Sequence, residues 1–377
     1  MMTAMTPGGG TVLFSGGGTG GHLFPSIAIA ERIMDIACGP QCHFACSDRE
    51  IDHEILSQAN VPHTGFTVRS LSSRPWKWPG FIYHMSRSTR RAKDLLRIHD
   101  VRCVVAMGGF ACAPALLAAK SLSLPRILVN LDAVPGKANR WLASCCSKIF
   151  SVWRNTILAG RTIPHVNMPL RRSVLGPDDA ASARRSLGLS PDRPVLFITG
   201  ASQGAQTIND MMVELANRPD FVHRMADWQV LHLSGHGNDQ PVRKAYESHG
   251  LDAKVLPFSD QMGLAWAAAD LAISRAGANS VAEVAANRVP TLFFPYPFHR
   301  DQHQRLNAEP LAEAGGALIL EDVKDAVANA DQTIGPLLEL ANDEPARHRM
   351  VNALGQSEGL STGDGADELA RLITNMC

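Results

Sequence analysis

The sequence has few cysteines, no net charge and no long apolar run. Eight cysteines in 377 residues are too few for a disulfide scaffold, which indicates a reducing compartment. Because 36 Lys and Arg residues balance 36 Asp and Glu residues, the chain lacks the basic excess of dedicated nucleic-acid binders. No apolar run reaches the roughly 18 residues of a membrane-spanning helix, and residues 1–10 lack the features of a signal peptide. We therefore expect a soluble protein with no nucleic-acid partner.

The chain does contain enough apolar sequence for two cores. Its hydrophobic content of 45% is that of a globular protein, and at about 100–200 residues per domain its length predicts two domains. Short apolar runs alternate with helical patterns, as expected for buried parallel strands in an α/β fold. The predicted strands are residues 11–15, 42–46, 102–107 and 126–130, then 195–199, 229–233, 254–256, 271–274 and 291–294.

One stretch interrupts this alternation. Residues 155–169 contain Pro164 and Pro169 and are predicted to form a linker. The sequence therefore predicts two Rossmann-like βα domains, residues 1–165 and 166–361, each opening with a strand, a glycine-rich loop and a helix. A last amphipathic helix is predicted at about 362–377, and packing of this helix on the first domain is one arrangement that the sequence allows. Ligands of such domains bind at the carboxyl ends of the strands, so we expect the two domains to face each other across a ligand-binding cleft.

The densest motif is Gly16-Gly17-Gly18-Thr19-Gly20-Gly21, followed directly by His22. Glycines after a strand allow a sharp turn, and the N-terminus of the next helix, expected from about Phe24, can bind phosphate. His22 would then lie over a phosphate or hydroxyl, so we predict a catalytic or binding role; a structural histidine is the alternative. A dinucleotide fold is a rival, but the nearest acids, Asp48 and Glu50, lie about 30 residues on instead of roughly 20. A tight turn without a ligand is the third interpretation.

Polar motifs also follow strands in the second half. Ser202, in the small-residue loop 200–205, is predicted either to cap the next helix or to hold a phosphate. Glu283 lies three residues after the predicted N-cap Ser280, so it is either a capping-box residue or an acceptor for sugar hydroxyls. The hydrogen-bonding side chains of residues 295–307 suit a polyhydroxylated ligand, with a solvated loop as the alternative.

Metal binding is not expected. Cys38, Cys42 and Cys46 are spaced four residues apart, but the last two fall within a predicted strand. The sequence contains no Cys-x-x-Cys pair. We therefore predict no metal site.

The zero net charge conceals two strongly charged segments. Residues 69–97 hold eight basic residues and one acid, a charge of +7, whereas residues 321–344 hold seven acids and one base, a charge of −6. Aromatic rings directly before a cluster of arginines predict a peripheral patch on an anionic membrane, and a partly buried loop with a solvated helix is the alternative. The predicted patch consists of Trp76, Trp78, Phe81, Ile82, Arg87, Arg90 and Arg91.

Taken in order, these motifs resemble the MurG family, the peripheral-membrane N-acetylglucosaminyltransferases of peptidoglycan synthesis, which have the two-domain GT-B fold. The resemblance covers nearly the whole chain. Its most specific elements are Gly17-Gly18-Thr19-Gly20-Gly21-His22, Ser202-Gln203-Gly204-Ala205, residues 275–283, His303-Gln304 and Asn307-Ala308. Asn167-Met168-Pro169-Leu170-Arg171 is similar to the family's linker motif with one insertion, and Pro135-Gly136, Asn139 and Arg140 also match.

The resemblance implies transfer of GlcNAc from UDP-GlcNAc to a polyprenyl-diphosphate-linked sugar, namely undecaprenyl-diphosphate-MurNAc-pentapeptide. It implies inversion, no metal and no cofactor, at the cytoplasmic face of the plasma membrane, with cell-wall synthesis proteins as further partners. His22 would be the general base. The acceptor diphosphate would contact Gly18, Thr19, Gly20, Gly21 and Asn139. The donor would contact Arg171, Ser202, Gln203, Gly204, Ala278, Asn279, Ser280, Glu283, His303 and Gln304.

Within the implied donor set, Ser202, Gln203 and Arg171 would meet the diphosphate. Glu283 would hold the ribose, and His303 and Gln304 would hold the GlcNAc hydroxyls.

Departures from the family pattern lie on the acceptor side. Asn130-Leu131-Asp132 stands where the family typically has Glu-Gln-Asn, and Cys112 stands where it usually has Ser. A UDP-GlcNAc transferase with a different lipid acceptor is therefore one alternative. A UDP-GlcNAc epimerase, which needs no lipid acceptor, is a second, and a binding protein that has lost catalysis is a third.

Overall fold

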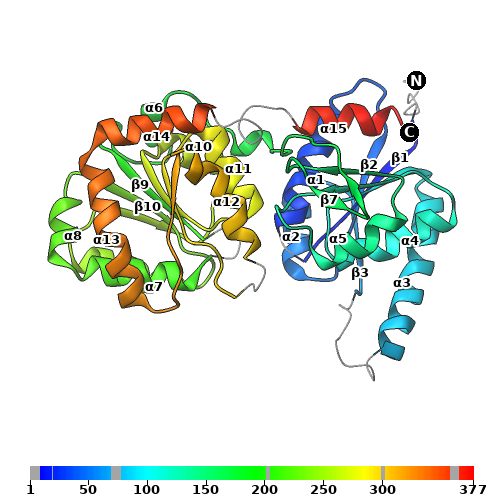
Figure 1. Ribbon diagram of the computed structural model, residues 1–377, viewed down its shortest axis with the longest axis horizontal. Coiled ribbons are helices and arrows are strands. Elements are labelled where there is room, and N and C mark those ends of the chain that lie inside the picture. Colours follow the sequence, from blue (N-terminus) through cyan, green and yellow to red (C-terminus); the bar gives the residue numbers. More distant parts are fainter. Residues whose placement is uncertain (1–8, 19, 69–77, 201–203, 299–301, 357–364) are drawn as a thin grey trace, which may run out of the picture. The chain divides into compact units, whose positions relative to one another are not determined.

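Two compact units make up the protein. The computed structural model describes residues 9–18, 20–68, 78–200, 204–298, 302–356 and 365–377. Unit 1 consists of Met1–Arg171 together with Gly363–Cys377, and unit 2 of Arg172–Thr362 (Figure 1). The chain thus divides between Arg171 and Arg172, slightly beyond the boundary suggested by the sequence, and its last helix belongs to unit 1.

Unit 1 is built on a six-stranded parallel sheet of order β3-β2-β1-β4-β5-β6. Its strands are β1 (Thr11–Ser15), β2 (Gln41–Ser47), β3 (His63–Phe66), β4 (Val101–Ala106), β5 (Arg126–Asn130) and β6 (Lys148–Ser151). Its helices are α1 (Gly20–Met34), α2 (Glu50–Gln58), α3 (Trp78–Ile98), α4 (Ala113–Ser121), α5 (Lys137–Leu142) and α15 (Gly365–Thr374). Every residue of β1 is buried, because helices cover both faces of a parallel sheet.

Unit 2 repeats this design, with a parallel sheet of order β11-β10-β9-β12-β13-β14. Its strands are β9 (Val195–Thr199), β10 (Gln229–Leu233), β11 (Ala253–Leu256), β12 (Leu271–Ser274), β13 (Thr291–Phe293) and β14 (Ala317–Ile319). Its helices are α6 (Ala180–Ser186), α7 (Gln206–Ala216), α8 (Pro219–Arg224), α9 (Asp239–Ser248), α10 (Met262–Ala268), α11 (Ala278–Asn287), α12 (His303–Glu313), α13 (Ala326–Asn342) and α14 (Glu344–Gln356).

The core of unit 2 shows how a continuously apolar strand serves two layers. Leu196 and Ile198 of β9 pack in the cluster that contains Met211 of α7. The intervening residue Phe197 packs in the other cluster, where Trp266 of α10 meets it edge-on with ring centroids 4.8 Å apart. Successive strand side chains point to opposite faces, so a strand covered on both sides must be apolar throughout.

Strand order fixes where ligands can bind in each unit. Numbered within its own unit, each sheet runs 3-2-1-4-5-6, the order of dinucleotide-binding Rossmann domains. In such sheets the crossover connections leave in opposite directions from strands 1 and 4, and a crevice opens at their carboxyl ends. These strands are β1 and β4 in unit 1, and β9 and β12 in unit 2.

Three local expectations need correction. Residues 155–169 are not a plain linker, because they contain the hairpin β7 (Ile157–Leu158) and β8 (Arg161–Thr162), which belongs to unit 1. Helix α1 begins at Gly20 instead of near Phe24, so His22 lies in its first turn. The short strands β3, β6 and β14 were not expected, and each of them is at an edge of its sheet.

Candidate functional site

The glycine-rich loop of unit 1 is fixed in a conformation that only glycine adopts readily. Gly17 has φ +147° and Gly18 has φ +89°, both in the region that disfavours L side chains. A Cβ atom on Gly17 would lie 2.4 Å from Oδ2 of Asp52. The loop therefore packs with its backbone directly against the start of α2.

Both polar groups of Gly18 are occupied by that helix start. The Gly18 amide donates to Oδ2 of Asp52 at 2.7 Å, and its carbonyl accepts from Nη1 of Arg49 at 2.9 Å. The sequence suggested that Gly18 would hold an acceptor diphosphate. In this conformation its amide faces Asp52, so the amides of the α1 N-terminus at Gly20 and Gly21 are better candidates for that contact.

His22 lies against the turn that follows β4. A Cβ atom on Gly108 would be 3.1 Å from Nε2 of His22, and one on Gly109 would be 3.4 Å from its Cε1. Gly108 and Gly109 have φ +112° and +78°, so here too glycine is required for the close approach. The structure thus places His22 where the carboxyl ends of the neighbouring strands β1 and β4 meet.

The surroundings of His22 favour the neutral imidazole. Burial lowers its pKa below the ordinary histidine value, and the carboxylates of Asp132 and Asp52 and the Gly17 carbonyl oppose this shift only in part. Nδ1 of the ring is buried. In a neutral imidazole one nitrogen carries a hydrogen and the other can accept a proton, as a general base must.

A third strand end contributes amides to the same region. Asn139 of α5 donates from Nδ2 to Oδ1 of Asn130, the buried last residue of β5, at 3.1 Å. Asn130 in turn donates to the Asp132 carbonyl at 2.7 Å and to Oγ of Ser151 at 3.2 Å. Oδ1 of Asn139 would lie 3.0 Å from a Cβ on Gly108 and is itself without a partner among the described residues. Asn139 and His22 are therefore both placed close to Gly108.

Cys112 serves a structural purpose at this site. Its Sγ lies 2.9 Å from the Ser15 carbonyl and 2.8 Å from the Gly108 carbonyl, so its single S–H hydrogen is shared between the ends of β1 and β4. Burial raises the pKa of the Cys112 thiol to about 12, so it is not a reactive thiolate at neutral pH. A serine hydroxyl also has a single donor hydrogen and could make the same contact, which explains why cysteine can stand at this position.

Unsatisfied polar atoms gather around the carboxyl ends of β1 and β4. Buried polar groups are normally hydrogen-bonded, so each exception calls for a reason. In the part of the chain that the structure describes, four such atoms belong to unit 1 residues of this region: Oγ of Ser15, Nδ1 of His22, Oδ1 of Asp52 and Oδ1 of Asn139. Their concentration makes this the candidate site of unit 1.

In unit 2, the helices that follow β9, β12 and β13 begin without a side-chain cap from any described residue. They are α7 after β9, α11 after β12 and α12 after β13, with Ala205, Gly277 and Gln302 at the cap positions. Uncapped helix N-termini present backbone N–H groups and a positive dipole end. Gly204, which precedes α7, has φ +73° and packs on the end of β10, where a Cβ would lie 2.4 Å from the Ser234 carbonyl. This arrangement suits an anionic ligand.

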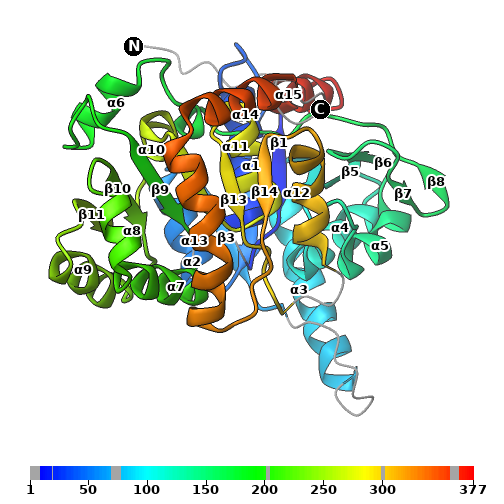
Figure 2. The same cartoon turned by 60° about the vertical axis from the view of Figure 1, so that its left-hand side comes forward.

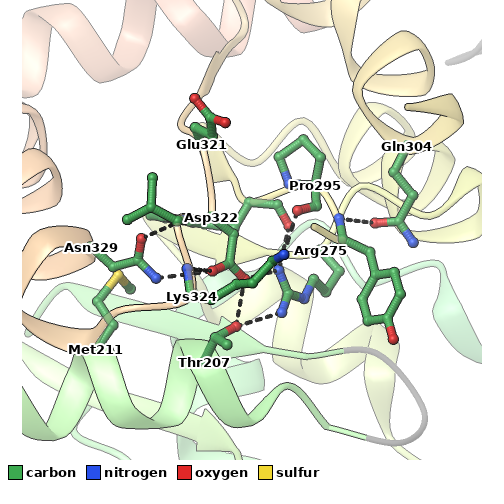
Figure 3. Close-up of polar contacts among 12 residues, drawn as sticks. Thr207, Met211, Arg275, Pro295, Gln304, Glu321, Asp322, Lys324 and Asn329 are labelled. Atoms are coloured by element: carbon green, nitrogen blue, oxygen red, sulfur yellow. Dashed lines mark hydrogen bonds and ion pairs between the residues drawn. The ribbon is translucent and has the colours of Figure 1, made fainter. Parts of the chain in front are cut away.

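A buried ion pair supports these strand ends (Figure 3). Nη1 of Arg275, which follows β12, lies 2.7 Å from Oδ2 of Asp322 and donates to the Phe294 carbonyl at 3.0 Å. Thr207 of α7 accepts from Nη2 of Arg275 at 2.7 Å and donates to Asp322 at 2.5 Å. Asn329 of α13 donates to the other carboxylate oxygen at 3.0 Å. The pair thus locks β12, β13, α7 and α13 to one another.

At Asp322, hydrogen bonds lower the pKa of the carboxyl more than burial raises it. Burial alone would raise the pKa of this carboxyl, but hydrogen bonds from Thr207, Arg275 and Asn329, with one from the Lys324 amide, lower it below the ordinary aspartate value. Asp322 is therefore ionised at neutral pH, and the acidic segment 321–344 contributes to the interior as well as to the surface.

Glu283 does not form a capping box. Helix α11 begins at Ala278 with Gly277 at the cap, so Ser280 lies inside the first turn instead of at the cap position. Glu283 is buried and accepts from Nε1 of Trp266 at 2.9 Å. This bond orients the carboxylate. Ala278, Asn279 and Ser280 form the first turn of α11, which follows β12, and so lie at the carboxyl end of the sheet.

The remaining predicted donor residues are placed as follows. His303 and Gln304 open α12, and Oε1 of Gln304 accepts from the Tyr296 amide at 2.9 Å. Arg171 is the last residue of the first stretch of unit 1, and its guanidinium carbon lies 3.9 Å from the centroid of the Phe24 ring. The predicted site residues Thr19, Ser202, Gln203 and Trp76 lie outside the described residues.

The basic segment continues into α3, one end of which extends beyond the rest of unit 1 (Figure 2). Ile82 and Tyr83 are 60% and 63% exposed, and Arg87, Arg90 and Arg91 are exposed on the following turns, while Phe81 is half-buried. Among the described residues no helix is both long and apolar enough to cross a bilayer. The same residues contain no cluster of three His, Cys, Asp or Glu side chains suited to a metal ion.

Comparison with known proteins covers both units. Residues 12–151 match the glycosyltransferase family 28 N-terminal domain, and residues 195–358 match the glycosyltransferase family 28 C-terminal domain. Two curated relatives are named UDP-N-acetylglucosamine–N-acetylmuramyl-(pentapeptide) pyrophosphoryl-undecaprenol N-acetylglucosamine transferase. The one from Nocardioides is 34% identical over 97% of this chain and 98% of its own. The one from Geobacter sulfurreducens is 32% identical over 96% and 94%.

Solved structures agree on the fold. The crystal structure of Acinetobacter baumannii MurG superposes with a TM-score of 0.71 at 23% identity, covering 97% of this chain and 99% of that one. UDP-GlcNAc 2-epimerase from Neisseria meningitidis, bound to UDP-GlcNAc, superposes with a TM-score of 0.61 at 12% identity, covering 97% and 98%. The predicted GT-B fold, with two Rossmann-like units, is confirmed. From the full-length identity to the curated transferases we conclude that this chain belongs to the MurG family of glycosyltransferases.

Proposed function

We propose that this enzyme transfers GlcNAc from UDP-GlcNAc to the MurNAc 4-hydroxyl of undecaprenyl-diphosphate-MurNAc-pentapeptide, the step from lipid I to lipid II in peptidoglycan synthesis. The names of the curated relatives specify an N-acetylglucosamine transferase that acts on an N-acetylmuramyl-(pentapeptide) pyrophosphoryl-undecaprenol. The structural observation that carries the proposal is the placement of His22, with its lowered pKa, at the carboxyl ends of β1 and β4 and against Gly108 and Gly109.

The proposed chemistry is a direct displacement. The neutral His22 imidazole takes the proton of the acceptor hydroxyl as its oxygen attacks the anomeric carbon of GlcNAc. The bond from that carbon to the UDP oxygen breaks, and UDP leaves with the bonding electrons, so the configuration inverts. The lowered pKa of His22 keeps the ring unprotonated and available near neutral pH.

On the donor side, we propose that unit 2 holds UDP-GlcNAc. The uncapped N-termini of α7, α11 and α12 would neutralise the diphosphate and the charge that develops on UDP, with help from Arg171, and this requires no metal. The nearby predicted contacts are Ser202, Gln203 and Gly204 before α7, Ala278, Asn279, Ser280 and Glu283 in α11, and His303 and Gln304 in α12.

Membrane attachment follows from the lipid acceptor. We propose that the start of α3 binds an anionic membrane surface at the cytoplasmic face, with Phe81 and Ile82 at headgroup depth and Arg87, Arg90 and Arg91 attracting the lipid charge. Exposed Ile82 beside three exposed arginines supports this more than a purely solvated helix, since a large exposed aliphatic side chain gains nothing from water.

One observation favours a second candidate acceptor. Asn130, in place of the family's glutamate, is fully buried and bonded to Ser151 and to Asn139, whose Oδ1 lies close to Gly108 as His22 does. A change at this buried position, one residue removed from the Gly108 turn, alters the hydrogen bonding and charge behind the proposed acceptor site. A polyprenyl-diphosphate sugar other than MurNAc-pentapeptide is therefore the alternative substrate.

The test is an assay with radiolabelled UDP-GlcNAc and separate lipid-diphosphate acceptors, with product extracted into organic solvent. Label in the lipid phase with the MurNAc-pentapeptide carrier supports the proposal. Label only with a different lipid-linked sugar supports the alternative acceptor. Conversion of UDP-GlcNAc with no acceptor present would establish an epimerase. This reaction serves as a control because the Neisseria meningitidis epimerase shares the fold.

A further inference from the structure

Asp52 is an unusual buried acid. Within the described residues, unit 2 has two buried acids, Asp322, which pairs with Arg275, and Glu283, which accepts from the Trp266 indole. Asp52 is fully buried in unit 1, yet among the described residues only neutral groups donate hydrogen bonds to it. Burying a carboxylate without a cation costs free energy. We therefore expect a buried carboxylate of this kind to be needed as a strong hydrogen-bond acceptor.

All the donors converge on a single oxygen of Asp52. Oδ2 accepts from Oγ of Ser47 at 2.5 Å, from the Gly18 amide at 2.7 Å and from the Ser47 amide at 3.2 Å. Oδ1 is buried and without a partner in the described part of the chain. The carboxylate therefore bridges the end of β2 and the glycine-rich loop, 34 residues away in sequence, through one atom.

The loop has no room to move toward α2. A Cβ on Gly17 would meet Oδ2 of Asp52 at 2.4 Å, and Arg49 holds the Gly18 carbonyl from the other side. Gly18 is followed after one residue by Gly20, where α1 begins, and His22 lies in that first turn. The Gly18 peptide thus lies two residues before the start of α1 and four before His22, which contacts the Gly108–Gly109 turn.

We propose that Asp52 is a positioning residue for the transfer reaction: its buried carboxylate fixes the Gly17–Gly18 turn and thereby places His22 against the acceptor. This inference rests on the proposed function of His22 as general base. In this role Asp52 contacts neither substrate. It acts through the Gly18 amide and through its negative charge.

The charge has a second consequence. Three groups bear on His22 from the elements around it: Asp132 after β5, Asp52 in α2 and the Gly17 carbonyl, and all three raise its pKa against the effect of burial. Removing the charge of Asp52 leaves burial less opposed, so the pKa of His22 falls further. A base with a lower pKa stays unprotonated to lower pH, and the acidic limb of a kcat/KM profile moves with it.

Two substitutions separate the hydrogen bond from the charge. In Asp52→Asn the amide oxygen can take the place of Oδ2 and keep the Gly18 bond, while the NH₂ group takes the place of Oδ1, which has no partner to lose. In Asp52→Ala the acceptor for Gly18 is gone. Glu54→Gln, an exposed residue on the same helix, is the matched control for loss of one negative charge.

For Asp52→Ala we expect kcat to fall about 10- to 100-fold, since small displacements of a catalytic group cost this much, with the Kd of UDP-GlcNAc changed less than twofold. For Asp52→Asn we expect kcat within about threefold of wild type, the usual effect of keeping a neutral hydrogen bond, and an acidic limb at lower pH. Glu54→Gln should match wild type in both respects.

His22 can also be titrated without any assay of activity. Imidazole proton chemical shifts, with His22 assigned by its loss in His22→Gln, should give a lower pKa in Asp52→Asn than in wild type. A folded Asp52→Ala enzyme with wild-type kcat, an Asp52→Asn enzyme as impaired as Asp52→Ala, or an unchanged His22 pKa in Asp52→Asn would overturn the inference. Failure of the wild-type enzyme to label any lipid acceptor refutes the proposed function instead, and the titration still decides whether Asp52 acts on His22.

Discussion

The two units share a strand order but treat their strand ends differently. In unit 2, the buried polar groups that join β12, β13, α7 and α13 are matched: Arg275 meets Asp322, and Thr207 and Asn329 complete the carboxylate's hydrogen bonds. Among the described residues, the strand ends of unit 1 hold a buried carboxylate without a cation, Asp52, and buried polar atoms of Ser15, His22 and Asn139 without hydrogen-bond partners. The two units therefore differ in how the buried acid at their strand ends is neutralised.

Two histidines express the same contrast. His232 in β10 is fully buried and bonded at both ring nitrogens, to Oη of Tyr246 at 2.8 Å and to Oδ1 of Asn209 at 3.0 Å. His22 in unit 1 is half-buried and leaves Nδ1 without a partner among the described residues. A satisfied histidine is part of a core, whereas an unsatisfied one at a strand end is available for chemistry. Substitutions that affect one unit and spare the other can test this division.

The largest effect is expected at His22. His22→Ala should lower kcat by about 10²- to 10⁴-fold, the usual contribution of general-base catalysis. Binding of UDP-GlcNAc, measured by calorimetry, should stay within a factor of two because unit 2 is unchanged. The His249→Ala variant, at an exposed histidine of unit 2, is the control and should retain full turnover. Unchanged turnover in His22→Ala would remove this residue from its proposed role.

Next in size is the ion pair of unit 2. Arg275→Ala leaves Asp322 charged and buried without its cation, which should reduce the free energy of unfolding of unit 2 by about 3–5 kcal/mol. Urea unfolding followed by circular dichroism gives the measurement. Asp331→Asn breaks the exposed pair with Arg218 and should change stability by less than about 1 kcal/mol. Equal losses in the two variants would show that the buried network is not what distinguishes unit 2.

The sequence predicts the central part of both sheets because burial on two faces leaves a continuous apolar run. Strands β1, β5, β9, β10 and β12 have the predicted bounds. The edge strand β3, with sequence HTGF and three half-buried residues, has no such run, since an edge strand has fewer neighbours to exclude water. β14 at the other sheet's edge is missed for the same reason.

The site is less predictable, because its main groups are defined by contacts distant in sequence. Asp52 lies two residues beyond Glu50, in a helix start where acids are usually solvated, and only the fold brings it to Gly18. Asp322 is likewise hidden in an acidic segment until Arg275 meets it. His22 could be proposed from the sequence because a glycine-rich turn before a helix has a local signature, whereas Asn139 was implied only by the resemblance to the MurG family. A search for a buried acid opposite the glycine-rich loop could have found Asp52.

Membrane binding tests the exposed basic surface of α3 in unit 1. Replacing Arg87, Arg90 and Arg91 with Ala should weaken partitioning onto phosphatidylglycerol vesicles by about 100-fold, at roughly 1 kcal/mol for each cation. Sedimentation with vesicles of increasing anionic content gives the partition coefficient. The control replaces three exposed arginines of unit 2, Arg185, Arg224 and Arg349, and should change it little. Equal weakening in both triple variants would mean that overall charge, and not the α3 surface, drives attachment.

The last effect, which is the smallest when measured per pH unit, is a pH dependence of stability assigned to the satisfied histidine. Burial lowers the pKa of His232 to about 3, against about 6.5 in an unfolded chain. Between these values the unfolded state binds a proton that the folded state does not, so stability should fall as pH decreases, by at most about 1.4 kcal/mol per pH unit. The loss should begin near pH 6.5 and end near pH 3.

Urea unfolding of wild type and His232→Gln at several pH values isolates this contribution. The variant is expected to be less stable at pH 7, since glutamine cannot reproduce both ring contacts with Tyr246 and Asn209. The stability gap between the two proteins should narrow as pH decreases from 6.5, because only wild type carries the protonation penalty at this position. A constant gap would mean that His232 keeps its proton affinity on folding, and the contrast between a satisfied and an unsatisfied histidine would then rest on His22 alone.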